Sequence, residues 1–226
     1  MPPLFSYGFR PFFLGAGLIA LVVVPLWSLS LATGLALPLA WPPMLWHAHE
    51  MVFGFVPAAI AGFLLTAVPS WTGRKGFAGP PLIVLFSVWL AGRLVTGVSA
   101  ETPAALVATI DLAFFPLLAA LLAPPLVRER NRNTPLLLVL LALWISQCVF
   151  HWAAWRNDAG TAHQATLAAI DITLILVTVI GGRIVPSFTA TALRLSGSTA
   201  VPKSRRGLTP VVVASMVAVT VVDLLL

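Results

Sequence analysis

Long apolar stretches separated by short polar loops dominate the hydrophobic pattern of the chain. A helix needs about 20 mostly apolar residues to cross the hydrocarbon of a bilayer, and six stretches meet that need: 12–31, 44–69, 82–98, 103–127, 135–155 and 163–188. A seventh apolar run, 210–226, reaches the last residue without a flanking Trp or basic anchor, so we expect a truncated seventh helix. The strands of a membrane barrel would alternate apolar and polar residues, and these stretches do not. The pattern predicts an all-α fold, a polytopic transmembrane helical bundle of six complete helices plus the truncated seventh, with a polar linker at 194–209.

The composition of the chain is typical of an integral membrane protein. Apolar residues make up 59% of it and charged residues only 9%, against about 25% charged in a soluble domain. These values exclude a water-soluble enzyme and a disordered tail. The single cysteine, Cys148, cannot form an internal bridge, which excludes a disulfide scaffold. We therefore interpret the net charge of +6 as a sign of membrane topology and not of nucleic-acid binding.

The loop charges predict an orientation, because Lys and Arg accumulate on the cytoplasmic side of a membrane protein. If the N-terminus is cytoplasmic, the outer loops hold only Arg156. The inner side then holds all the other basic loop residues, namely Arg10, Arg74, Lys75, Arg128, Arg130, Arg132, Arg194, Lys203, Arg205 and Arg206. We therefore expect the N-terminus in the cytoplasm.

All four histidines, His47, His49, His151 and His163, fall at the outer end of the predicted bundle. Neutral imidazole is a common ligand of transition metals and haem iron. Helices that meet there can offer several imidazoles to one metal, and we take all four as candidate metal and cofactor ligands. The alternative is that they are interfacial residues that face headgroups or water.

The segment "WHAHEMVFGF" combines two of these histidines with a carboxylate. Residues three or four apart share a helix face, so His47 falls in one stripe with Glu50, Met51 and Gly54, whereas His49 points elsewhere. We therefore expect His47 to face the bundle interior, and we do not expect both histidines on one metal. Glu50 lies within an apolar span and needs a partner there.

Other ionisable residues also lie inside the apolar spans: Arg93, Asp111, Asp171 and, in the seventh run, Asp223. Such residues are costly in a membrane and mark functional sites or buried pairs. Arg93 either neutralises the propionates of a haem or forms an ion pair with Asp111 or Asp171. The carboxylates are also candidates for a proton relay.

The fifth apolar stretch places an aromatic wall beside a histidine. Trp144, Cys148, His151 and Trp155 follow helical spacing, and Gln147 lies one turn before His151. This wall suits a flat macrocycle, and the alternative is an interfacial Trp belt alone. Cys148 is either a small buried apolar residue or a copper ligand.

Three motifs give the chain a family likeness: "LFSYGFRPFFLGAG" at 4–17, "WHAHEMVFGFVPAAIAGFLLTAVPSWTG" at 46–73 and "GGRIVPSFT" at 181–189. In these motifs the chain resembles the NnrS family. The resemblance implies a bacterial inner-membrane protein that contains haem and copper and is linked to nitric oxide metabolism and nitrosative-stress protection in denitrifying and pathogenic bacteria. It places His47, His49 and Glu50 in the histidine motif of the family. Family members are nearly twice as long, so we expect this chain to match the N-terminal half and to need the C-terminal half to complete a site.

Two functions of different class follow. The first is a haem and metal protein that binds or converts nitric oxide or protects metabolism from it. The second is a transporter or permease whose intramembrane charges line a path for its substrate. The clustering of all histidines at one membrane face favours the first. No motif identifies an electron donor, so we infer no catalytic residue.

Overall fold

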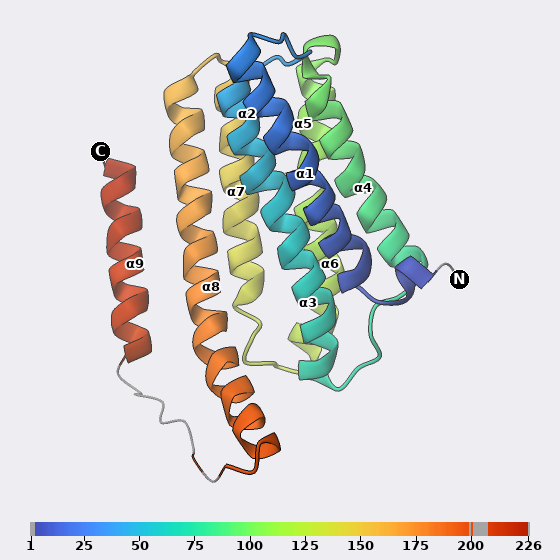
Figure 1. The fold of residues 1–226 in the computed structure, drawn as a ribbon, viewed down its shortest axis with the longest axis vertical. Helices are drawn as coiled ribbons and strands as arrows, with labels where there is room; N and C mark the ends of the chain where they lie inside the picture. Colours follow the sequence, from blue (N-terminus) through green and yellow to red (C-terminus); the bar gives the residue numbers. More distant parts are fainter. Residues whose placement is uncertain (1–2, 199, 201–207, 226) are drawn as a thin grey trace. The chain divides into compact units, whose positions relative to one another are not determined.

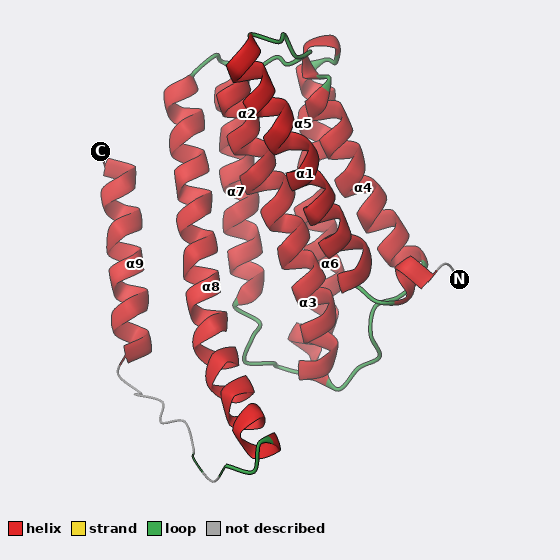
Figure 2. Cartoon of the chain, in the orientation of Figure 1, coloured by secondary structure: helices red, strands yellow, loops and turns green. Residues whose placement is uncertain are grey.

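The structure is a computed structural model that describes residues 3–198, 200 and 208–225. Helix is the only regular secondary structure in that part of the chain (Figure 2). Two short 3-10 turns, η1 (Pro3–Ser6) and η3 (Ser99–Glu101), accompany a π-helix, η2 (Glu50–Phe55). The α-helices are α1 (Phe9–Thr33), α2 (Pro43–His49), α3 (Val56–Thr72), α4 (Pro80–Gly97), α5 (Ala104–Leu112), α6 (Phe114–Arg128), α7 (Leu136–Trp155), α8 (Ala159–Leu195) and α9 (Leu208–Leu225).

Six helical stretches of the described chain are long and apolar enough to cross a membrane, which confirms the predicted fold class. They are Phe9–Thr33, Pro43–Thr72, Pro80–Gly97, Ala104–Arg128, Leu136–Trp155 and Ala159–Leu195. In the predicted seventh run, the apolar stretch Pro210–Asp223 lies within α9. The last long stretch continues past its predicted end at 188, so part of the predicted linker is helical. The rest of that linker lies largely outside the described residues.

The chain divides into two compact units, 1–166 and 167–226. Within the first unit, α1 packs against α3, α3 against α6, α6 against α7, and α4 against α5 (Figure 1). The core is apolar, with fully buried side chains such as Phe12, Leu118 and Phe150. Leucines such as Leu21 and Leu138 are exposed on the outside, as expected for helices that face lipid. The second unit contains the greater part of α8 together with α9.

The second predicted span is not a uniform α-helix, because the π-helix η2 separates α2 from α3. A π turn holds an extra residue, and such turns occur frequently at functional sites. The indole Nε1 of Trp89 on α4 donates a hydrogen bond of 2.9 Å to the carbonyl of Gly54 in this π turn. A residue of the neighbouring helix therefore supplies a partner for the irregular backbone, which is a requirement in a membrane.

Candidate metal centre

Five ionisable side chains from four apolar spans meet inside the first unit. His49 ends α2, Glu50 begins η2, Arg93 lies on α4, Asp111 on α5 and His151 on α7. Their exposed fractions are between 0% and 7%. Buried ionisable groups are costly unless they are paired and hydrogen-bonded. We call these five residues the buried cluster.

Asp111 is the centre of the cluster. Its Oδ1 accepts a hydrogen bond from the guanidinium of Arg93. Its Oδ2 lies 2.8 Å from Nε2 of His151 and accepts a bond of 2.8 Å from the side-chain amide of Gln147. The same Oδ2 lies 3.1 Å from Nε2 of His49, but this nitrogen has no hydrogen-bond partner among the described residues. One carboxylate thus brings two imidazoles together.

Glu50 is held from three sides. The hydroxyl of Thr96 donates a hydrogen bond of 2.8 Å to Oε1 of Glu50. Nδ1 of His49 lies 3.2 Å from the same oxygen, and NH1 of Arg93 lies 3.5 Å from Oε2. A proton on Nδ1 of His49 that points at Glu50 would leave the lone pair of Nε2 free.

Two glycines let the helices come close enough for these contacts. A Cβ at Gly92 would lie 2.9 Å from Oδ1 of Asp111 and 3.4 Å from its Cα. A Cβ at Gly54 would overlap the guanidinium of Arg93. Any larger residue at either place would displace a charged member of the cluster.

The cluster carries more negative than positive groups. Glu50 and Asp111 supply two carboxylates, whereas Arg93 supplies one guanidinium, so the second carboxylate needs a positive charge from a histidine or from a bound cation. A buried site with surplus negative charge attracts a cation, since interactions between charges are strong where water is excluded.

Three members of the cluster form a set that can hold a metal ion. Each of His49, Asp111 and His151 offers one ligand atom, and these atoms lie within 4.8 Å of one another. Two imidazole nitrogens with a carboxylate oxygen are a donor set for copper, zinc, iron or nickel. Among the described residues this is the one group of its kind.

The other histidines predicted as ligands lie outside the cluster. His47 is half-buried and stacks on Trp27, with ring centroids 4.0 Å apart and an angle of 12° between the rings. His163 is exposed near the start of α8. Their roles as metal or cofactor ligands stay predictions.

The expected face of the second span differs from the structure. The residue spacing placed His47 with Glu50 at the interior, whereas the structure buries His49 with Glu50 and Phe53. Gly54 of the same stripe is buried as well, so the stripe faces the interior although His47 is only half-buried. The span buries a second face through His49 and Phe53.

The sequence predicted either Asp111 or Asp171 as the ion-pair partner of Arg93. In the structure the partner is Asp111. Asp171 is buried on α8, in the second unit. Cys148 is half-buried on α7 and lines a pocket that also contains His151.

Sequence reasoning missed Thr96, which holds Glu50. A threonine in a membrane helix satisfies its hydroxyl on its own backbone, and Thr96 does so as well, through the carbonyl of Gly92 at 2.9 Å. Thr96 could have been identified from its spacing of three residues from Arg93, which places both side chains on the same face of α4.

Comparison with known proteins supports the family likeness. The family profile described as "NnrS protein" matches residues 3–226. No curated protein and no solved structure matches the chain. The matched range includes every member of the buried cluster. The chain, a multi-pass helical protein with a buried His, Asp and His group, therefore belongs to the NnrS protein family.

Proposed function

We propose that the protein is a membrane metalloprotein that holds a copper ion at His49, Asp111 and His151. The observation that carries this proposal is Nε2 of His49, a fully buried nitrogen without a hydrogen-bond partner among the described residues. An unpartnered buried polar atom costs about 1–3 kcal/mol. A metal ion beside Asp111 would take the lone pair of this nitrogen and remove that cost.

The surroundings of His49 fit a metal ligand. A ligating histidine typically gives its other ring N–H to a carboxylate or carbonyl, which orients the ring and raises its basicity. Glu50 occupies that place at 3.2 Å from Nδ1, and Thr96 in turn holds Glu50. The donor set can hold Cu²⁺, and we choose copper among the metals that it fits because the family resemblance implies copper.

The cluster suits an ion and not a macrocycle. The rings of His49 and His151 have centroids only 5.4 Å apart, and the three ligand atoms lie within 4.8 Å of one another. Arg93 is already engaged by Asp111 and Glu50, so it is a poor candidate for haem propionates. We therefore assign copper to the cluster, and the proposal of haem rests on the resemblance alone.

A bound copper ion would supply one-electron redox chemistry at the cluster. His49, Asp111 and His151 would hold the ion, Glu50 would orient His49, and the burial of the cluster would exclude water. Membership of the NnrS family supports a link to nitric oxide metabolism and nitrosative-stress protection in a bacterial inner membrane. With the N-terminus in the cytoplasm, the cluster would lie in the outer half of that membrane.

Metal content tests the proposal. We expect the purified protein to retain about one copper per chain after exposure to Cu²⁺ and removal of free metal. His49→Ala and His151→Ala should lose most of this copper, while yield and helical content stay similar.

His163→Ala is the matched control, because the same change is made at an exposed histidine outside the cluster. Full copper in both cluster variants would contradict the proposal. Loss of copper in His163→Ala as well would favour the wider set of histidine ligands predicted from the sequence.

A further inference from the structure

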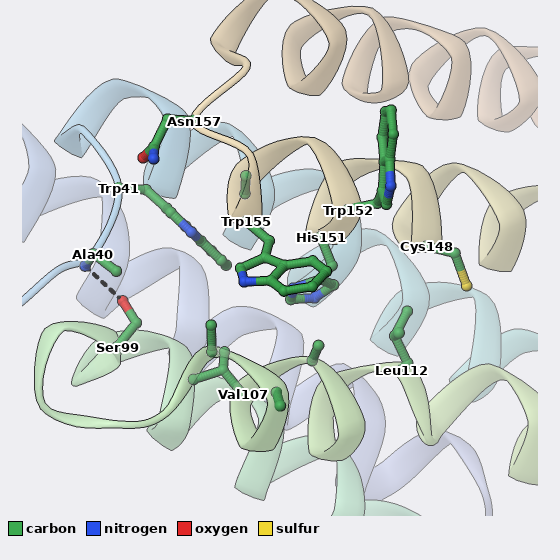
Figure 3. A pocket seen from close by; sticks show the side chains of 14 residues that line it. Ala40, Trp41, Ser99, Val107, Leu112, Cys148, His151, Trp152, Trp155 and Asn157 are labelled. Atoms are coloured by element: carbon green, nitrogen blue, oxygen red, sulfur yellow. Dashed lines mark hydrogen bonds between the residues drawn. The ribbon is translucent and has the colours of Figure 1, made fainter.

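A pocket of about 470 Å³ lies beside the buried cluster, within the first unit (Figure 3). It is bounded mainly by α5 and α7, with Trp41 from the loop before α2. Ala104, Ala105 and Ala108 on α5 are short side chains that leave space opposite α7. The volume is that of a pocket for a small organic molecule, and it is larger than a diatomic gas requires.

Indoles give the pocket flat apolar walls. Trp41, Trp152 and Trp155 all line it, and Figure 3 shows them around His151. The ring of Trp41 also lies 5.6 Å from the ring of His151 and 5.0 Å from that of His49. Aromatic faces favour a flat aromatic ligand, which stacks on them or meets them edge to face.

Two polar groups of the pocket have unused hydrogen-bonding capacity. Nε2 of His151 is taken by Asp111, whereas Nδ1 forms no hydrogen bond with any described residue. The hydroxyl oxygen of Ser99 accepts the backbone N–H of Ala40 at 2.9 Å and keeps its own proton to donate. Both residues are buried, so a ligand oxygen that reaches them would use the nitrogen of His151 and the donor proton of Ser99 that no described residue uses.

We propose that this pocket binds the ring of a membrane quinone. A quinone has a flat ring for the indole walls, ring oxygens for His151 and Ser99, and an apolar tail that remains in lipid. His151 serves either form of the ligand. With Nε2 donating to Asp111, Nδ1 accepts from a quinol hydroxyl; with Nε2 on a metal, Nδ1 carries a proton and donates to a quinone carbonyl.

A lipid acyl chain is the competing occupant, and it fits the polar groups poorly. It would fill the volume but would leave Nδ1 of His151 without a hydrogen bond and the hydroxyl proton of Ser99 without an acceptor. The quinone proposal goes beyond the copper proposal and does not depend on it, because Nδ1 is available in either state of the cluster.

Binding of decylubiquinone to the purified full chain in detergent tests the proposal, with decanol as the ligand that has a tail but no ring. Quenching of tryptophan fluorescence and calorimetry report the binding. We expect saturable binding of decylubiquinone and none of decanol. Ala108→Phe fills the pocket and should weaken binding at least about tenfold, the effect of losing roughly one good interaction.

Ala120→Phe is the matched control, because Ala120 is exposed on α6 and does not line the pocket. Its affinity should stay at the wild-type value. Ala105→Phe, a second change in the pocket wall, replaces Ala108→Phe if that variant does not fold. Unchanged yield and helical content in the pocket variants would show an intact fold.

The two proposals fail separately in this design. His49→Ala removes a copper ligand but no pocket residue, so it should bind decylubiquinone normally. Equal binding of decanol and decylubiquinone, or wild-type affinity in the folded pocket variants, would overturn the quinone proposal and identify a site for lipid or detergent tails.

Discussion

Arg93 is the one member of the buried cluster with a permanent positive charge, and its removal should be among the most damaging single changes in the first unit. Its side chain is 3% exposed; it pairs with Asp111, and its NH1 lies 3.5 Å from Oε2 of Glu50. Arg93→Met keeps much of the volume and removes the charge. Two carboxylates would then be buried without a counter-charge.

The size of the effect follows from burial. Breaking a buried ion pair by removing one partner costs about 3–5 kcal/mol, because the remaining charge is left uncompensated. The chain offers a matched control in Arg74, which pairs with Glu129 at 2.8 Å while the two side chains are 41% and 46% exposed. An exposed pair contributes about 0–1 kcal/mol. Arg74→Met should therefore have a small effect.

Chemical denaturation of the metal-free protein in detergent measures both variants. We expect Arg93→Met to lose at least about 3 kcal/mol of unfolding free energy and Arg74→Met to lose no more than about 1 kcal/mol. Combining Arg93→Met with Asp111→Asn should recover part of the loss, since it removes one uncompensated charge. Equal losses for the two single variants would refute the reasoning, because burial would then make no difference.

Two further predictions concern backbone approach and helix capping. Gly92→Ala places a Cβ 2.9 Å from Oδ1 of Asp111, so copper affinity, measured by competition with a chelator, should fall about tenfold. Gly17→Ala is the control, because a Cβ there meets nothing within 4 Å, and it should leave the copper affinity unchanged. Asp158 lies just before α8, and Thr161 in the first turn of that helix donates its hydroxyl and its backbone N–H to the Asp158 carboxylate at 2.6 Å and 3.0 Å. These bonds hold the pKa of Asp158 below its ordinary value. Asp158→Ala should therefore destabilise the protein at neutral pH. As the pH falls through the lowered pKa of Asp158, the unfolding free energies of variant and wild type should converge. A constant difference down to about pH 2 would show that the ionised Asp158 carboxylate does not stabilise this helix end.

The fold class was predictable because hydrophobic length is a direct physical requirement of the bilayer. The span at 135–155 matches α7, Leu136–Trp155, almost residue for residue. The break between α5 and α6 at Ala113 was missed, since Leu112 and Phe114 continue the apolar pattern on both sides. The arrangement of all spans as a single bundle stays a prediction, as does the orientation.

The individual charged residues of the cluster could be predicted from the sequence, but the contacts between them could not. Each buried charge stood out against an apolar background, so Glu50, Arg93 and Asp111 could be named as intramembrane polar residues. Which charge meets which depends on the packing of four spans and on the π turn. Residue spacing alone did not show that the second span buries two faces, so that His49 lies in the interior while His47 is half-buried.

Electron paramagnetic resonance of the Cu²⁺-loaded protein tests the central claim most directly, because imidazole nitrogens bound to the ion split its signal. Copper held by His49, Asp111 and His151 should show two coupled imidazole nitrogens. Copper that remains bound to His49→Ala or to His151→Ala should show only one. A spectrum with the same nitrogen couplings in the wild type and in both variants would contradict the assignment of this cluster as the metal centre.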